Sequence, residues 1–357
     1  MISRRKKQML LFLLRDKNKK KWLQIIKEFA TLGISRKELP LNYISHLMYR
    51  KNVTNYNDYL SLKENNRLLQ WSYSHAKEQI VLLENKLLFE EFLVKNNIPT
   101  PQIFFHNSKN RFTYKEDFFE IETKNDFFSF LEKVFNEEKI EHIFCKPIDG
   151  IRGENIFVID KNTHRKIADN LIDLVFSKAF IFQELIKQHE DLGRINYSSV
   201  NTLRVVTYKN KENKSEILSG FIRIGRNGAI IDNAHIGGIV VSFNKETGKT
   251  YAEGIQLIDN GGGIFFRHPD TGIIFDNLQI PHYSQVKKIV TQAASLFKFP
   301  LLGWDVAITS NGPVIIEANH DFHLLLSDRM EKGLKRSPTF KKLLEQIQRI
   351  TIDSEKL

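Results

Sequence analysis

Hydrophobic residues form two short runs within residues 303–321, at 304–309 and 314–318. Two apolar runs there flank a Ser-Asn-Gly-Pro break at residues 310–313, and this pattern predicts a β-hairpin. With a three-residue loop, Asp305 faces Glu317 across the strands, and the two-residue period places Asn319 on the same face. We expect the opposite face to pack into a core through Trp304, Val306, Ile308, Val314, Ile316 and Ala318.

Two carboxylates on one face of a hairpin repel each other unless a cation lies between them. Mg²⁺ prefers one or two carboxylates together with phosphate oxygens. The hairpin therefore predicts the floor of a magnesium and nucleotide site. A surface hairpin with solvated Asp305 and Glu317 remains the alternative.

Helical periodicity dominates residues 1–80, which we interpret as an N-terminal helical segment without chemistry of its own. The spacing i, i+3, i+4, i+7 predicts a first helix that ends near Gly33. Its apolar face comprises Trp22, Ile25, Ile26 and Phe29. Further helices are expected at about residues 41–50 and 56–73, and the segment is expected to pack on the main body or to contact a partner.

A short helix is predicted from Asn85, a good N-cap, to Leu93. Lys86 then lies in the first turn, where the helix dipole disfavours a cation. This placement favours an anionic ligand near Lys86, and a solvated surface lysine is the alternative.

Residues 102–182 predict a compact α+β subdomain with the element order β-α-β-β-α-β. Between its middle strands, Lys146 ends a strand and is followed by Gly150 and Gly153. Glycines let backbone N–H groups approach phosphate oxygens, and the ammonium group neutralises charge. A phosphate site is therefore one interpretation, and an ordinary hairpin turn is the other.

Further along, Gln183, Glu184, Leu185 and Ile186 form a strand that leads out of this subdomain. Arg204 and Arg223 each interrupt an apolar strand, and a buried guanidinium needs an anionic partner. That partner is either a ligand or an acidic residue of the protein. A glycine-rich loop follows at residues 232–238, and residues 281–297 predict an amphipathic helix.

The 357 residues are 41% hydrophobic and include a single cysteine, which indicates a globular protein of a reducing compartment such as the cytoplasm. The net charge of +11 is concentrated in residues 1–30, which carry ten Lys or Arg against two acids. This end is suited to peripheral contact with an anionic membrane surface, or it is simply solvated. Few aromatic residues are interleaved with the cations, which disfavours nucleic acid as a partner.

These motifs, in this order, resemble the ATP-grasp superfamily over about residues 80–330. The series Arg204, Arg223, Asn233 and Gly237-Gly238 is similar to the glutamate-ligase branch. The stretches 199–204 and 317–321 resemble the sugar-transfer-associated ATP-grasp group. The resemblance implies an α+β ATP-grasp fold, with two subdomains clasping ATP at residues 81–350. Residues 102–182 would be the lid and residues 183–350 the metal-binding core.

The resemblance also implies roles for individual residues. Nucleotide contacts would come from Lys86, Lys146, Gly150, Gly153, Gln183, Glu184, Leu185 and Ile186. One or two Mg²⁺ ions would be bound by Asp305, Glu317 and Asn319. The transferring phosphate or the substrate would be bound by Arg204, Arg223 and Asn233.

The implied reaction activates a substrate carboxylate as an acyl phosphate, which an amine or similar nucleophile then attacks. A saccharide or cell-envelope precursor is the expected carboxylate. An ATP-dependent phosphotransferase on the same fold is the second hypothesis, and a basic surface binder without catalysis is the third. A zinc site at Glu317, His320 and His323 is disfavoured because no His-Glu-x-x-His helix is present.

Overall fold

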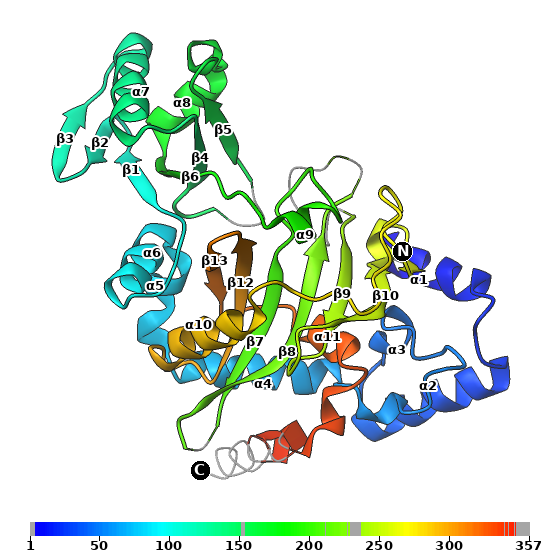
Figure 1. The fold of residues 1–357 in the computed structure, drawn as a ribbon. Coiled ribbons are helices and arrows are strands. Elements are labelled where there is room, and N and C mark those ends of the chain that lie inside the picture. Colours follow the sequence, from blue (N-terminus) through cyan, green and yellow to red (C-terminus); the bar gives the residue numbers. More distant parts are fainter. Residues whose placement is uncertain are drawn as a thin grey trace.

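The computed structural model describes residues 4–347, except residues 151–153, 211, 227, 229–236, 339, 342 and 346. Figure 1 shows a subdomain with a six-stranded sheet, which comprises residues 103–184 and is called the lid below, and a central seven-stranded sheet. The N-terminal helices lie at the end of the molecule away from the lid. Both sheets are antiparallel, and helices pack on them.

The lid sheet has the strand order β3-β2-β1-β6-β4-β5. A phenylalanine-rich core joins it to α7 and α8, and α7 starts at a capping box formed by Thr123 and Asp126. The predicted order β-α-β-β-α-β is incomplete, because an additional hairpin, β2-β3, follows β1. The lid elements are β1 (Ile103–Ser108), β2 (Arg111–Tyr114), β3 (Asp117–Glu120), α7 (Lys124–Glu138), β4 (His142–Pro147), β5 (Phe157–Asp160), α8 (Asp169–Ser177) and β6 (Ala179–Glu184).

The central sheet has the order β11-β10-β9-β8-β7-β12-β13. The two predicted arginine-bearing strands are confirmed as β7 and β8, while β9, β10 and β11 are not among the elements predicted from the sequence. The strands are β7 (Leu203–Lys209), β8 (Ser215–Ile224), β9 (Ile239–Phe243), β10 (Thr250–Gln256), β11 (Gly263–Phe265), β12 (Leu301–Thr309) and β13 (Gly312–Asn319).

The predicted hairpin is formed by β12 and β13, and Asp305 does pair with Glu317. The loop has two residues and not three, because Thr309 already pairs with Gly312. Val306 pairs with Ile315 and Asp305 with Glu317, so Ile316 forms a β-bulge in β13. This bulge restores the predicted pairing of Asp305 with Glu317. The bulge shifts the inward face of β13. The predicted core positions Val314 and Ile316 are therefore wrong, and Ile315 is the fully buried residue instead.

Helices cover both faces of the central sheet. One face carries α10, whose predicted inward residues Val286, Ile289, Val290 and Ala293 are buried, together with α5 and α6. The other face carries α4 and α11. The helices that cover the sheet are α4 (Leu62–Ser74), α5 (Ile80–Glu84), α6 (Lys86–Lys95), α10 (Tyr283–Ser295) and α11 (Leu324–Met330). A short helix, α9 (Glu190–Gly193), precedes β7. Short 3₁₀ turns are η1 (Tyr56–Asp58), η2 (Lys77–Gln79), η3 (His164–Lys166), η5 (Ile258–Asn260) and η6 (Leu334–Arg336).

The N-terminal segment contains α1 (Arg4–Arg15), α2 (Trp22–Arg36) and α3 (Asn42–Ser45). Helix α2 continues past Gly33 to Arg36, and α3 is much shorter than the predicted helix at residues 41–50. The segment has a hydrophobic cluster of its own, which includes Met9, Leu13, Ile25, Leu32 and Tyr43. The predicted apolar face of α2 is partly wrong, since Trp22 and Ile26 are exposed.

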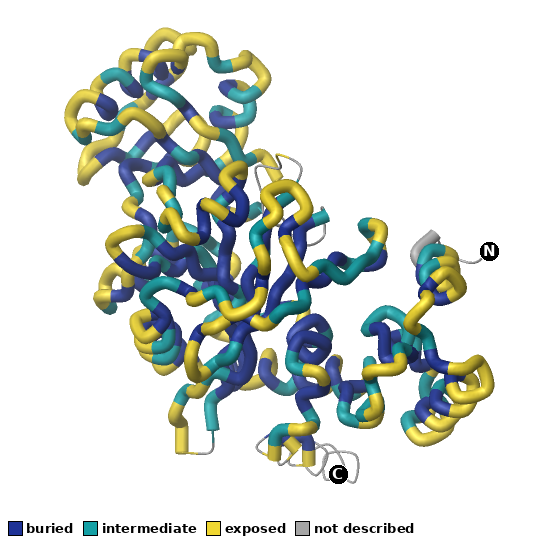
Figure 2. The backbone as a smooth tube through the Cα atoms, turned by 45° about the vertical axis from the view of Figure 1, so that its right-hand side comes forward, coloured by how far each residue is buried: buried dark blue, intermediate teal, exposed yellow. Residues whose placement is uncertain are grey.

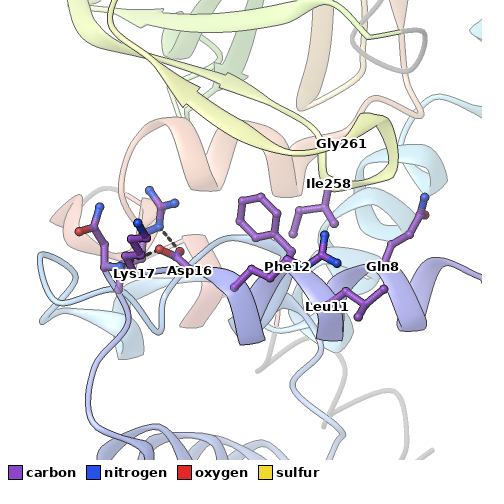
Figure 3. Close-up of a pocket in the computed structure, with 10 residues that line it drawn as sticks. Gln8, Leu11, Phe12, Asp16, Lys17, Ile258 and Gly261 are labelled. Carbon is purple, nitrogen blue, oxygen red and sulfur yellow. Dashed lines mark hydrogen bonds and ion pairs between the residues drawn. The ribbon is translucent and has the colours of Figure 1, made fainter.

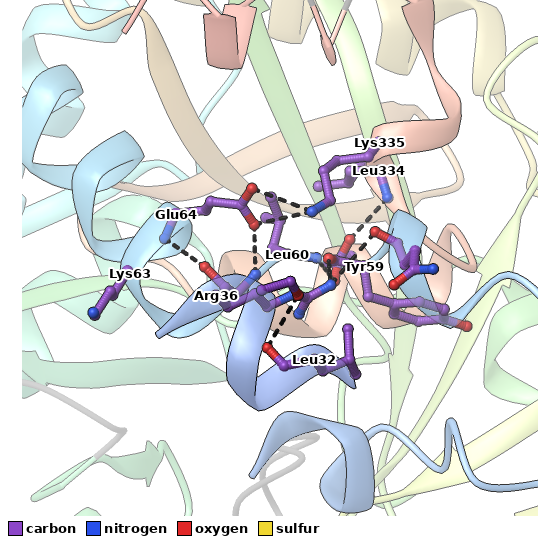
Figure 4. A network of polar contacts seen from close by, with 12 residues as sticks. Leu32, Arg36, Tyr59, Leu60, Lys63, Glu64, Leu334 and Lys335 are labelled. Carbon is purple, nitrogen blue, oxygen red and sulfur yellow. Dashed lines mark hydrogen bonds and ion pairs between the residues drawn. The ribbon is translucent and has the colours of Figure 1, made fainter. Parts of the chain in front are cut away.

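A buried polar network attaches this segment to the C-terminal part of the chain (Figure 4). The Asp328 carboxylate accepts hydrogen bonds from the backbone N–H groups of Leu60, at 2.9 Å, and Leu334, at 2.8 Å. Lys335 pairs with Glu64 at 3.1 Å. The N-terminal helices are therefore anchored to the central part of the molecule.

Candidate active site

The polar face of the β12-β13 hairpin brings together the three predicted metal ligands. Asp305 and Glu317 are register partners, and Asn319 donates a hydrogen bond to Glu317 Oε1 at 2.8 Å. The three side chains lie on the face of the sheet opposite α10, because Trp304 and Val306 occupy the other face. The predicted convergence of the three residues is confirmed.

Asp305 is also the common partner of Arg204 and Arg223, whose side chains are mostly buried. Its Oδ1 accepts from Arg204 Nε at 2.5 Å, and its Oδ2 accepts from Arg204 Nη2 at 3.1 Å and from Arg223 Nη2 at 2.8 Å. Arg223 additionally donates to Thr202 Oγ1 at 2.6 and 2.9 Å. Strands β7, β8 and β12 thus bring together charges that lie far apart in the sequence.

The electrostatics of this cluster favour the ionised carboxylate. Burial alone would raise the pKa of Asp305, but the guanidinium groups of Arg204 and Arg223 outweigh burial and lower the pKa below its usual value of 3.8. The sequence left open whether the arginines pair with a ligand or with the protein. The structure shows an ion pair with the protein in both cases.

This ion pair has a consequence for metal binding. Both Asp305 oxygens accept from guanidinium groups, so most of the negative charge available to a cation on this face comes from Glu317. Among the residues that the structure describes, no group of three or more His, Cys, Asp or Glu side chains is placed to hold a metal. One carboxylate with one amide is a ligand set that suits Mg²⁺ when phosphate oxygens complete the coordination. The zinc alternative at Glu317, His320 and His323 receives no support.

Lys86 lies at the start of α6, which packs against the edge strand β13. The helix begins at Lys86, and the side chain of its N-cap, Asn85, accepts from the backbone N–H of Leu88 at 3.0 Å. The Lys86 ammonium donates to the backbone carbonyl of Gly150 in the lid. Burial and, to a smaller extent, the neighbouring Lys146 lower the pKa of Lys86, while the carboxylate of Glu317 opposes that shift. Lys86 is therefore a partly buried cation that a further anion would stabilise.

Lys146 pairs with a carboxylate that the sequence analysis missed. Its Nζ lies 2.5 Å from Glu90 Oε1, and both side chains are buried. Burial raises the pKa of Glu90, and Lys146 opposes the shift. The signal for Glu90 was present in the sequence, because Lys86 and Glu90 are four residues apart and lie on the same side of α6.

Two buried polar atoms near this site have no hydrogen-bond partner within the described residues. One is Glu90 Oε2, and the other is Oε1 of Gln183 on β6. A buried polar atom without a partner is costly, so such atoms indicate a missing ligand or water. Gln183 pairs in register with Phe144, two residues before Lys146 on β4. Glu90 thus shares α6 with Lys86, and Gln183 lies on the strand next to the one that carries Lys146.

The remaining predicted residues are distributed as follows. Glu184 ends β6 and is exposed, and Leu185 and Ile186 follow it half-buried, which is the position of a connection between lid and core. Gly150 is half-buried beside Lys86. Gly153 and Asn233 lie outside the described residues.

A comparison with protein-family models gives one match, to the sugar-transfer associated ATP-grasp family, over residues 65–337. The match covers most of the chain. The chain belongs to this ATP-grasp family. The predicted α+β ATP-grasp fold is confirmed with it, and the comparison with curated proteins found no match.

Solved structures of several synthetases are similar to this chain at low identity. D-cycloserine synthetase is 10% identical with a TM-score of 0.43, and the alignment covers 80% of each chain. D-alanyl-alanine synthetase A from Vibrio cholerae is 14% identical with a TM-score of 0.40, covering 72% of this chain and 66% of the other. N5-carboxyaminoimidazole ribonucleotide synthetase from Thermotoga maritima is 13% identical with a TM-score of 0.36. There, the alignment covers 68% of this chain and only 43% of the synthetase.

The residues present fit a magnesium nucleotide. Lys146 and the unpartnered Gln183 oxygen come from the lid strands β4 and β6, whereas Lys86 of α6 and the Glu317–Asn319 pair belong to the core. Helix α6 packs against β13, which bears Glu317 and Asn319. Phosphate oxygens placed between them would meet a cation from one wall and a metal ligand from the other.

Proposed function

We propose that this ATP-grasp protein is an ATP- and Mg²⁺-dependent ligase that activates a substrate carboxylate for attack by an amine or a similar nucleophile. The observation that supports the proposal is the placement of Lys86 on a helix that packs against β13, the strand that carries the Glu317–Asn319 pair, with Lys146 held by Glu90 of the same helix. When bound, ATP with Mg²⁺ would supply the phosphoryl group that converts the carboxylate into an acyl phosphate.

The protein's own residues would act mainly by positioning and charge neutralisation. Lys86 and Lys146 would bind phosphate oxygens, and Gln183 to Ile186 would contact the base. Glu317 and Asn319 would hold Mg²⁺, with Asp305 as a further candidate ligand. Arg204 and Arg223 present a partly exposed cationic surface next to Asp305, which suits a phosphate or a substrate carboxylate.

The expected substrate is a saccharide or cell-envelope precursor that carries a carboxylate. This expectation rests on the name of the family, which associates it with sugar transfer. The experiment is a screen of carboxylated sugars and amino acids for substrate-dependent ADP release, with hydroxylamine as the trapping nucleophile. An acyl hydroxamate supports the ligase.

A stable phosphorylated product without hydroxamate would instead support a phosphotransferase on the same fold. If the protein binds no ATP in the presence of Mg²⁺, both proposals fail. For either activity, we propose that the protein acts in the cytoplasm.

Glu317→Gln is the most informative variant, because it removes the charge and keeps the shape. Turnover should be lost while the melting temperature stays close to that of the unchanged protein. Glu212→Gln, in the exposed turn between β7 and β8, is the matched control and should retain full activity. For the lysines, Lys86→Met is cleaner than Lys146→Ala, since the latter leaves Glu90 buried without its cation.

A further inference from the structure

The two N-terminal helices carry apolar residues on their solvent side as well as on their buried side. In α2, Leu23, Ile26, Ala30 and Ile34 are exposed, whereas Ile25, Glu28 and Leu32 are buried. The exposed residues recur at i, i+3, i+7 and i+11, which places them in one stripe along the helix. Leu23 is 84% exposed and Ile34 is 79% exposed. The stripe is therefore not part of the core.

Helix α1 repeats this arrangement. Met9 and Leu13 are buried in the N-terminal cluster, and Leu10, Leu11 and Leu14 are exposed on the other side. Figure 2 shows that exposed positions follow the outer side of both helices, at the end of the molecule away from the lid. Clustered apolar side chains on an exposed face are typical of an interaction surface.

The exposed charges of α1, α2 and the loop that joins them, within residues 7–37, all have one sign. Residues 7–37 contain two acids, Asp16 and Glu28, and both are buried in ion pairs: Asp16 with Arg50 at 2.6 Å and Glu28 with Lys20 at 2.6 Å. The exposed charged residues of this stretch are Lys7, Arg15, Lys17, Lys21, Lys27 and Lys37. The surface next to the apolar stripe thus carries cations without exposed carboxylates.

A cavity adjoins the same surface. It has a volume of about 580 Å³ and lies between α1 and the η5 turn (Figure 3). Leu11, Phe12 and Ile258 form apolar walls, Arg15 and Lys17 contribute cations, and the Asp16–Arg50 ion pair also lines the cavity. Apolar walls beside cationic groups suit a lipid with an anionic headgroup.

We propose that α1 and α2 dock this protein on an anionic lipid surface. The apolar stripe enters the interface between headgroups and acyl chains, and the lysines and arginines contact the negative headgroups. Among the described residues, no helix is long and apolar enough to cross a membrane, so the contact is a peripheral one. Charge complementarity selects this partner over a second copy of the chain, because two such cationic faces would repel each other.

The test is flotation of the full-length protein with vesicles of phosphatidylcholine, with or without phosphatidylglycerol. Binding to the anionic vesicles, weakened by high salt and nearly absent on neutral vesicles, is expected. The charge variant Lys17→Glu/Lys21→Glu/Lys27→Glu should lower the partition coefficient by about 100-fold, since each basic residue near the surface is worth a factor of about five. The apolar variant Leu23→Ser/Ile26→Ser/Ile34→Ser should lower it by at least about tenfold.

Matched controls come from exposed residues elsewhere in the structure. Val94→Ser/Phe118→Ser/Ile274→Ser and Lys95→Glu/Lys166→Glu/Lys178→Glu should each leave binding unchanged. If an N-terminal variant unfolds, docking can be measured on the unchanged protein instead. Brominated lipid then quenches the emission of a tryptophan that enters the membrane interface. Of the three tryptophans, Trp22 is exposed next to the stripe, Trp71 is half-buried in α4 and Trp304 is buried, so quenching that is absent in Trp22→Phe supports docking through α2.

Three results would overturn the proposal. The first is that both N-terminal variants bind anionic vesicles as tightly as the control variants do. The second is dimerisation in sedimentation velocity without vesicles that the apolar variant abolishes, which would identify the stripe as a contact between copies. The third is binding to RNA, lost in the charge variant and kept in the apolar variant, by a protein that does not float with vesicles.

Discussion

Replacing Asp305 with asparagine tests whether one carboxylate holds the two arginines of the core. The carboxylate accepts three charge-assisted hydrogen bonds, at 2.5, 3.1 and 2.8 Å. The three side chains are 6%, 13% and 16% exposed for Asp305, Arg204 and Arg223, so solvent cannot replace the lost charge. Removing one partner of a buried ion pair costs about 3–5 kcal/mol. Arg223 keeps its hydrogen bonds to Thr202, which places the expected loss near the lower end of that range.

The assay is urea unfolding of Asp305→Asn, with Glu317→Gln as the matched variant on the paired strand. Glu317 is half-buried and accepts from Asn319, so Glu317→Gln should change the free energy of unfolding by less than about 1 kcal/mol. Adding Arg204→Met to Asp305→Asn should recover part of the loss, since neighbours in one network are not additive. If Asp305→Asn lowers the free energy of unfolding by less than about 1 kcal/mol, or if the effects in the double variant are strictly additive, Asp305 does not hold the two arginines as described.

Three further predictions follow from individual contacts. Because burial lowers the pKa of Lys86 below 10.5 and a bound triphosphate favours the ammonium form, nucleotide affinity should fall as pH rises through that lowered pKa. Calorimetry should detect proton uptake on binding at alkaline pH, and uptake that persists in Lys86→Met would contradict the assignment. Burial raises the pKa of Asp328 to about 7, against an ordinary value of 3.8, although two backbone N–H groups oppose the shift. The stability from this group should therefore be complete below pH 3.8 and be lost as pH rises through about 7, and Asp328→Asn should flatten that pH dependence. A Cβ added at Gly303 would lie 2.8 Å from Phe322 Cβ, so Gly303→Ala should cost about 1–3 kcal/mol in urea unfolding, and an unchanged midpoint would show that the site can relax.

The sequence was sufficient for the features that depend on local periodicity. The hairpin and the α10 helix follow from alternation and helical spacing, and the structure has them within a few residues of the predicted limits. The lid elements occur in the predicted order, apart from the additional β2-β3 hairpin. The β2-β3 hairpin escaped prediction because its turn places Lys115, neither Asn nor Gly, at a positive φ of 56°. Similarly, the bulge in β13 leaves no local signal, yet it decides that Ile315 and not Ile316 enters the core.

The candidate site depends on contacts between distant segments, and here sequence reasoning could supply the residue types but not their partners. Arg204 and Asp305 are 101 residues apart, and they meet only because β7 and β12 are neighbours in the central sheet. The sequence therefore led to two separate predictions. One was a cation between the Asp305 and Glu317 carboxylates, and the other was an anionic partner for each arginine. The structure joins them, since Asp305 is the anion and the guanidinium groups already relieve its repulsion with Glu317. A metal at this hairpin is then not needed to make the fold stable, and its affinity should depend on the phosphate oxygens that arrive with the nucleotide.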